Sequence, residues 1–282
     1  RFCFPPGAQD EKAHFCVRRF LGVAMWSYYG SKSKVINLYP PPKFGKVIEP
    51  FAGSARYALK YFDRDILIVD KYDVIIKIWK WLQVCSRDDV LKLPRLKEAE
   101  RLSEYKFDCE EQRLLMGFLI SKGAESPRDK ATMRATTHRP NNINFQLKFI
   151  ASNLFKIKHW EIRLASYDEI ENQEATWFID PPYQVGGYSY VMNNAGWNYS
   201  DLARWCQSRK GHVIVCENTN ADWLPFLPMR EMKGSQKKTV EAIWSNFPTA
   251  YNYQQQSLFS TGTPNTARTR QGRALAGGVV SE

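Results

Sequence analysis

The sequence predicts an α/β fold in which a mostly parallel β-sheet is covered by helices on both faces. Three observations support this prediction. Short runs of β-branched and apolar residues recur along the chain, and several end at an acidic residue. Segments with apolar residues at helical spacing separate many of these runs. The runs are continuously apolar, which is typical of strands buried on both faces of a parallel sheet.

The expected strands span residues 46–49, 66–69, 176–179, 212–216, 229–232 and 239–244. The last two are expected to form an antiparallel hairpin at the edge of the sheet. The expected helices between strands span 54–62, 74–82 and a segment that begins near Ser200. Ser200 and the acid that follows it suit the first turn of a helix.

Residues 88–155 interrupt the alternation and are predicted to form an inserted, mainly helical domain. Its expected helices span 96–105, 110–121 and 143–154, around a polar and basic loop at 122–142. The catalytic domain would then consist of residues 25–87 and 156–258. Residues 1–24 and 259–282 are expected to be disordered or non-native, with Met25 as the natural start.

Composition excludes several classes of protein. The chain has 282 residues of which 44% are hydrophobic, too many for a disordered protein. No stretch approaches 18 uncharged apolar residues, so a membrane span is not expected. The 6 cysteines form no CxxC pair, which argues against a zinc site or a disulfide framework. We therefore expect a cytoplasmic protein without a metal.

The formal charge of +11 is concentrated in two blocks of the body of the chain. Residues 25–87 hold 11 Lys/Arg against 5 Asp/Glu, and residues 121–160 hold 8 against 2. Two basic blocks flanked by acidic segments indicate a surface that faces phosphate groups. An ordinary solvated basic face is the alternative.

Two of the expected strands end in groups suited to a nucleoside. The small residues Ala52, Gly53 and Ser54 follow the first strand and would let the backbone approach a ligand closely. Asp70 ends the second strand, where a carboxylate could accept hydrogen bonds from a ribose diol. The segment lacks the GxGxxG fingerprint, so a plain strand-to-helix junction remains the alternative.

The segment Asp180-Pro181-Pro182-Tyr183 follows a third apolar strand. The two prolines hold the chain extended and remove two N–H donors, so that nearby carbonyl groups are left to accept. Asp180 adds acceptors beside them, and Tyr183 adds a flat aromatic face. A planar amine such as N6 of adenine would find acceptors for its hydrogens and a stacking surface there.

Taken in this order, these residues resemble the DNA adenine-N6 methyltransferases of the Dam type, which use S-adenosylmethionine. The resemblance covers most of residues 25–258 and implies a Rossmann-like methyltransferase fold. It implies that Asp180 to Tyr183 are catalytic and that Asp70 binds the ribose. The other cofactor-binding residues that it implies are Tyr28, Lys32, Glu49, Phe51, Ala52 and Gly53.

The sequence departs from the family pattern in two places. The family has an acid before an aromatic residue to contact the cofactor adenine, and here Ser166 stands at that position with Asp168 two places on. Either Asp168 substitutes from a shifted loop, or the backbone makes the contact. The glycine segment also keeps only Gly53 of the usual glycines.

The resemblance implies methyl transfer to an adenine flipped out of duplex DNA, because a stacked base cannot reach the cofactor. Residues 88–155 would be the target-recognition domain, residues 216–220 would flank the base pocket, and a basic hairpin at 233–238 would meet phosphates. The DNA-binding residues expected are Lys122, Arg128, Lys130, Arg134, Arg139, Asn141, Lys237 and Lys238. A monomer in the cytoplasm of a bacterial or phage-infected cell is expected.

Other functions remain open at this point. The same acceptors suit a cytosine-N4 or an RNA adenine-N6 methyltransferase, and a non-catalytic DNA-binding protein with a degenerate methyltransferase fold is a further alternative. A nicotinamide-dependent dehydrogenase is disfavoured by the missing fingerprint. A cytosine-C5 methyltransferase is excluded because no Pro-Cys pair occurs. Pairing with a restriction endonuclease is left open.

Overall fold

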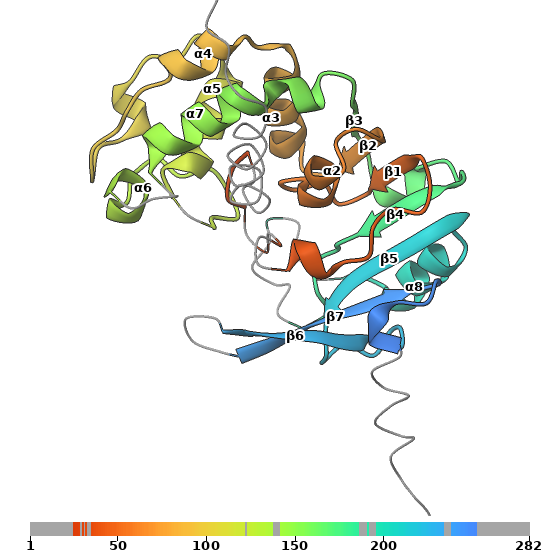
Figure 1. Cartoon of the computed structure of the whole chain (residues 1–282). Coiled ribbons are helices and arrows are strands. Elements are labelled where there is room, and N and C mark those ends of the chain that lie inside the picture. Colours follow the sequence, from red (N-terminus) through yellow and green to blue (C-terminus); the bar gives the residue numbers. More distant parts are fainter. Residues whose placement is uncertain are drawn as a thin grey trace, which may run out of the picture.

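The computed structural model describes most of the chain between residues 25 and 252 (Figure 1). The described residues are 25–28, 30, 32, 35–121, 123–137, 142–185, 191, 196–233 and 238–252. The two terminal segments predicted to be disordered or non-native, 1–24 and 259–282, lie outside this part.

Within the described residues, seven strands form one sheet in the order β3-β2-β1-β4-β5-β7-β6. The first five strands of this order are parallel, and β7 runs antiparallel between β5 and β6. The strands are β1 Lys46–Glu49, β2 Asp65–Asp70, β3 Glu161–Leu164, β4 Ala175–Ile179, β5 Gly211–Asn218, β6 Leu227–Lys233 and β7 Lys238–Ser245. Strand order reverses between β1 and β4, which is where open α/β sheets bind ligands.

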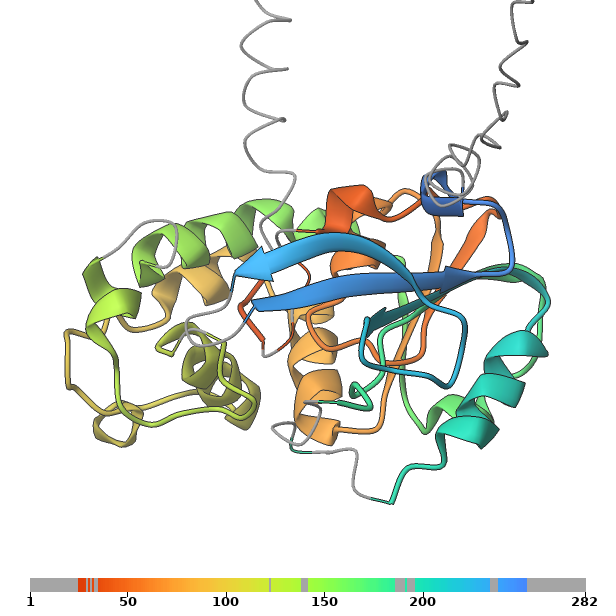
Figure 2. The same ribbon diagram turned by 90° about the horizontal axis from the view of Figure 1, so that it is seen from below.

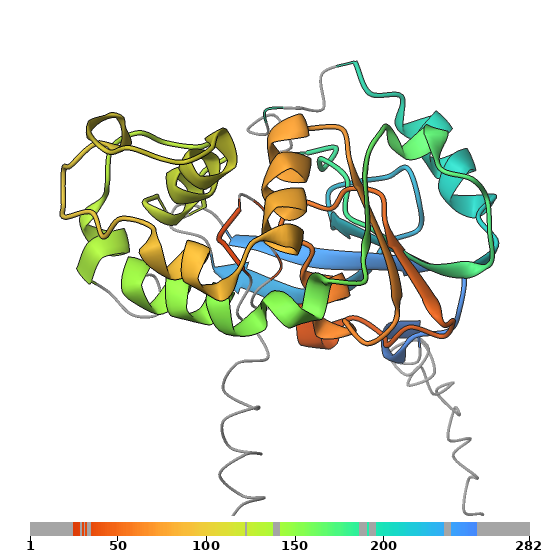
Figure 3. The same ribbon diagram turned by 90° about the horizontal axis from the view of Figure 1, so that it is seen from above.

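Helices cover both faces of the sheet, as predicted. On one face, α2 (Arg56–Lys60) and α3 (Asp73–Val84) pack on residues such as Ile66 and Ile68 of β2. On the other face, α8 (Tyr199–Gln207) packs on a second core that includes the alternate β2 residues Leu67 and Val69. Figures 2 and 3 show α3 and α8 on opposite sides of the sheet.

Between α3 and β3 the strand–helix alternation gives way to helices. These are α4 (Arg87–Lys92), α5 (Glu110–Leu119), α6 (Met133–Thr137) and α7 (Ile143–Asn153). Their apolar side chains join the core beneath α3; Phe118 of α5, for example, lies 6.5 Å from Trp26 between ring centroids. The predictions of helices at 110–121 and 143–154 are confirmed by α5 and α7.

The helix predicted at 96–105 is wrong, since only a 3-10 turn at Leu102–Glu104 forms there. Backbone groups that a helix would use internally pair instead with another segment: Ala99 and Leu102 donate to the carbonyls of Ala131 and Asp129. Ala99 also has a positive φ of 66°, which interrupts a right-handed helix. Conversely, α6 lies within the segment predicted to be a loop at 122–142.

Strand β3 and helix α4 were also not predicted from the sequence. Strand β3 is a four-residue edge strand with exposed or half-buried side chains, so it shows no apolar run. Helix α4 has six residues, too few for a periodic pattern, but Ser86 and Asp89 form a capping box at its start. The hairpin predicted at 229–232 and 239–244 is confirmed by β6 and β7.

Candidate active site

The carboxyl ends of β1, β2 and β4 border one cavity of about 500 Å³. Parallel pairing brings these ends together, because Ile48 of β1 lies beside both Leu67 of β2 and Trp177 of β4. This volume lies within the usual range for a pocket that holds a small molecule or cofactor. The sequence-predicted residues that line it are Tyr28, Lys32, Glu49, Phe51, Ala52, Gly53, Asp70, Asp180 and Pro182.

Asp70 is fixed beside the glycine turn. Its Oδ2 accepts the backbone N–H of Gly53 at 2.9 Å, and its Oδ1 accepts that of Tyr72 at 2.9 Å. Burial raises the pKa of Asp70 to about 6, and the backbone N–H groups oppose that shift. Gly53 has φ +45°, and a Cβ there would lie 3.1 Å from the Tyr28 ring, so this position favours glycine.

Glu49 lies at the end of β1 and lines the same cavity. It is 2% exposed, and burial raises its pKa to about 8. Its Oε1 accepts the backbone N–H of Ala58, which ties the strand end to α2. A cation bound in the cavity would therefore lower the pKa of the buried Glu49 carboxyl and favour its charged form.

Aromatic rings form one wall of the cavity. The ring centroids of Phe51, Tyr167 and Trp197 lie 5.4 to 5.7 Å from one another. Ser166 and Tyr167 line the cavity, whereas Asp168, the predicted alternative for the adenine contact, is exposed. In a capping turn, the Ser166 N–H donates to Glu169 at 2.7 Å. This turn fixes the backbone of Ser166 and Tyr167.

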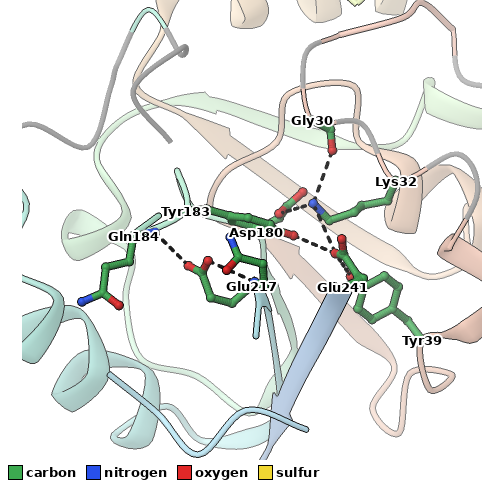
Figure 4. Close-up of polar contacts among 9 residues, drawn as sticks. Gly30, Lys32, Tyr39, Asp180, Tyr183, Gln184, Glu217 and Glu241 are labelled. Carbon is green, nitrogen blue, oxygen red and sulfur yellow. Dashed lines mark hydrogen bonds and ion pairs between the residues drawn. The ribbon is translucent and has the colours of Figure 1, made fainter. Parts of the chain in front are cut away.

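Asp180 follows β4 and forms an ion pair with Lys32, at 2.8 Å between Oδ1 and Nζ (Figure 4). The same ammonium lies 4.6 Å from the centroid of the Tyr183 ring. Burial raises the pKa of Asp180, and the charge of Lys32 opposes this shift. Asp180 lines the cavity and its side chain is 20% exposed, so a ligand can reach it.

Glu241 of β7 joins this group of side chains, although the sequence analysis did not identify it. Its Oε1 accepts the hydroxyls of Tyr183 at 2.7 Å and Tyr39 at 2.6 Å, and lies 3.6 Å from the Lys32 ammonium (Figure 4). An acidic residue is usually exposed at the surface, so nothing local marks Glu241 as part of a site. Only the pairing of β7 with β5 brings it here.

The segment after Asp180 is fastened on two sides. The Tyr199 hydroxyl donates to the Pro182 carbonyl at 2.8 Å, and the Gln184 N–H donates to Glu217 Oε2 at 3.1 Å. Glu217, at the end of β5 in the segment predicted to flank the base pocket, is buried, and burial raises its pKa to about 7. The chain around Tyr183 is therefore held by both neighbouring elements.

The structure places three of the predicted DNA-binding residues on the helical segment. Arg134 is exposed on α6, Lys130 is exposed beside it, and Arg128 is ion-paired with Glu125. Lys238 is the first residue of β7, and the β6–β7 hairpin projects to the same side of the molecule as α6 (Figures 1 and 2). Four predicted residues, Lys122, Arg139, Asn141 and Lys237, lie outside the described residues.

Neither the family models nor the curated proteins include a match to this chain. Among solved structures, a "conserved hypothetical protein" of Streptococcus pyogenes is 12% identical, with a TM-score of 0.32 over 76% of this chain and 94% of that one. A "putative methylase" of Haemophilus influenzae is 10% identical, with a TM-score of 0.32 over 85% and 98%. A "putative methyltransferase" of Escherichia coli is 10% identical, with a TM-score of 0.31 over 87% and 91%.

The fold is the Rossmann-like methyltransferase fold. This assignment rests on the strand order, with five parallel strands followed by an antiparallel β7 inserted between β5 and β6. The similarities to solved structures are too remote to support an activity. In the described ranges, no helix is long and apolar enough to cross a membrane. The same ranges hold no group of three or more His, Cys, Asp or Glu side chains arranged to hold a metal.

Proposed function

We propose that this protein is an S-adenosylmethionine-dependent methyltransferase that modifies N6 of a flipped adenine in duplex DNA. The observation that carries the proposal is the meeting of two strand ends at one cavity. Asp70 of β2 supplies a buried acceptor suited to a ribose, and Asp180 supplies a carboxylate next to the Tyr183 ring. A nucleoside cofactor and a planar amine would thus meet at the same place.

The residues present fit S-adenosylmethionine. Asp70 is oriented by two backbone N–H groups, and Gly53 leaves room that a side chain would fill. Phe51, Tyr167 and Trp197 offer flat faces for an adenine ring, and Glu49 is a buried carboxyl in the same cavity that would hold a cationic part of the cofactor. When bound, S-adenosylmethionine supplies a methyl group on a positively charged sulfur.

The chain's own groups would position the amine and receive its proton. The Asp180 carboxylate and the Pro181 carbonyl would accept hydrogen bonds from the two amine hydrogens, which orients the nitrogen lone pair toward the cofactor. The Tyr183 ring would stack on the base. Because burial raises the pKa of Asp180, this carboxylate is suited to take the proton that the methylated amine loses. Positioning and electrostatics would provide most of the rate enhancement.

The DNA would lie across the side of the molecule where α6 and the β6–β7 hairpin project (Figure 2). Arg134 and Lys130 on the helical segment supply exposed positive charge there. Residues 88–155 would act as the target-recognition domain, with arginine and asparagine side chains able to read base edges in the major groove.

The test is to incubate the protein with labelled S-adenosylmethionine and a randomised duplex library, and to locate the modified base. We expect label at adenine N6 in one sequence context. Asp180→Ala should abolish transfer while DNA affinity is retained, and Asp63→Ala, an exposed site at the amino end of β2, should leave transfer unchanged. Label on cytosine, label only on RNA, or full activity of Asp180→Ala would each contradict the proposal.

A further inference from the structure

Glu241 reaches the candidate active site from the antiparallel part of the sheet. In β7 it pairs with Asn218 of β5 and Arg230 of β6, so its position is fixed by strands on both sides. The residue is 8% exposed. A buried carboxylate is costly unless donors face it, and here two hydroxyls and one ammonium converge on Oε1.

The two tyrosines that donate to Glu241 have different surroundings. The Tyr39 ring packs edge-on against Phe178 in the core, with centroids 5.1 Å apart. The Tyr183 ring instead lies beneath the Lys32 ammonium and belongs to the segment that follows Asp180. Burial raises the pKa of Tyr183 well above its ordinary value, so its hydroxyl keeps the proton that it donates.

The bond to Glu241 holds the free end of the Tyr183 ring. Its other end is attached to a backbone fastened by Tyr199 at Pro182 and by Glu217 at Gln184. A ring held at both ends keeps one plane, and a stacking partner for a base needs a defined plane. Without the bond to Glu241, rotation about the side-chain torsions would be less restricted.

We propose that Glu241 is a positioning residue that fixes the plane of the Tyr183 ring for stacking of the target base. This inference rests on the proposed function and extends it to a residue 58 positions further along the chain. Glu241 acts on the Tyr183 ring through the Tyr183 hydroxyl, which donates to Glu241 Oε1.

A double-mutant cycle tests the coupling between Glu241 and Tyr183. Tyr183→Phe removes only the hydroxyl, and Glu241→Leu replaces the acceptor with an apolar side chain of similar size. We expect each variant to lower kcat about tenfold while KM for S-adenosylmethionine changes less than about twofold, and the double variant to be no worse than either. A double variant whose loss of kcat equals the product of the two single losses would overturn the inference.

Tyr39→Phe is the matched control. It removes a bond of similar length to the same oxygen, but from a ring that packs in the core. We expect kcat of Tyr39→Phe to stay within about threefold of the parent. A loss as large as that of Tyr183→Phe would mean that Glu241 serves only general stability.

Ring motion gives a readout that needs no turnover. In protein with ¹³C-labelled tyrosine, we expect Glu241→Leu to increase the flipping rate of the Tyr183 ring at least about tenfold, and Tyr39→Phe to leave it nearly unchanged. An unchanged rate in Glu241→Leu would overturn the inference whether or not methyl transfer occurs. Absence of methyl transfer in the parent protein would instead contradict the proposed function.

Discussion

At the scale of single residues, Asp70 combines two opposing influences. Its carboxylate accepts two backbone N–H groups, which favour the charged form, but burial outweighs them and raises its pKa to about 6. The proposed role, accepting hydrogen bonds from a ribose diol, requires the carboxylate. Protonation of Asp70 would reduce its capacity to accept hydrogen bonds. This protonation would occur at pH values used in ordinary assays.

We therefore expect affinity for S-adenosylmethionine to weaken about tenfold between pH 8 and pH 5, because the free protein takes up a proton at Asp70 as the pH falls through about 6. Asp70→Asn should bind more weakly at pH 8 and lack this component of the pH dependence. Titration calorimetry from pH 5 to 8 measures both. The difference between the two proteins isolates Asp70, because Glu49, whose pKa is about 8, contributes equally to each.

An Asp70→Asn protein with the same pH dependence as the parent would contradict this assignment. So would a parent protein whose affinity is the same at pH 5 and pH 8. Either result would place the ribose contact elsewhere in the cavity.

At the scale of elements, β4 and β5 lie in tight contact where β5 begins. Gly211 has φ +95°, and a Cβ there would lie 2.2 Å from the carbonyl oxygen of Ala175. No side chain fits without shifting the backbone of β4, the strand that leads to Asp180. We expect Gly211→Ala to lower the free energy of unfolding by about 2–4 kcal/mol.

Urea denaturation followed by fluorescence measures that loss. Gly45→Ala is the matched control, since a Cβ at Gly45 has no atom within 4 Å and Gly45 lacks a positive φ. Its free energy of unfolding should stay within about 0.5 kcal/mol of the parent. Equal effects of the two changes would show that the contact with Ala175 relaxes easily.

Some of these strands and site residues could be predicted from the sequence, and others could not. Strands β1, β2, β4 and β5 were predictable because both of their faces are buried, which gives continuous apolar runs. Asp70 and Asp180 were predictable for the same reason, since each stands where such a run stops. Strand β3 and the segment around Ala99 were not, because pairing partners elsewhere in the chain determine their backbone conformation.

Residues contributed by distant strands could not be found in this way. Glu241 acquires its neighbours through the pairing of β7 with β5, and no local pattern encodes that pairing. Trp197 and Tyr167 likewise meet Phe51 only in the folded chain. The roles of the predicted site residues, and of the inserted segment, remain predictions.

At the scale of the whole molecule, positive charge is unevenly distributed along a chain of net charge +11. If the α6 side contacts DNA phosphates, affinity should fall steeply with salt. We expect Arg134→Ala to weaken duplex binding by about 1–3 kcal/mol and, if it contacts a phosphate, to reduce the salt slope by about one unit. Fluorescence anisotropy over a salt series measures both quantities.

Arg64→Ala provides the control for that experiment. Arg64 is exposed at the amino end of β2, away from the carboxyl ends that border the cavity, and the substitution removes the same charge. Equal losses for both variants would indicate a nonspecific effect of net charge. A loss confined to Arg134 would assign the DNA-facing side.

Strand β7 has a consequence for how this protein can diversify. Its register is set by pairing along β5 from Ile214 to Asn218, where a slip of one residue would turn Glu241 to the opposite face and bring Val240 or Ala242 in its place. Lys238 and Thr239, at the start of β7, pair with β6 and not with β5. Sequence changes at these two positions should therefore leave the register of Glu241 unaltered, so that one end of the strand can vary while the group around Tyr183 is kept.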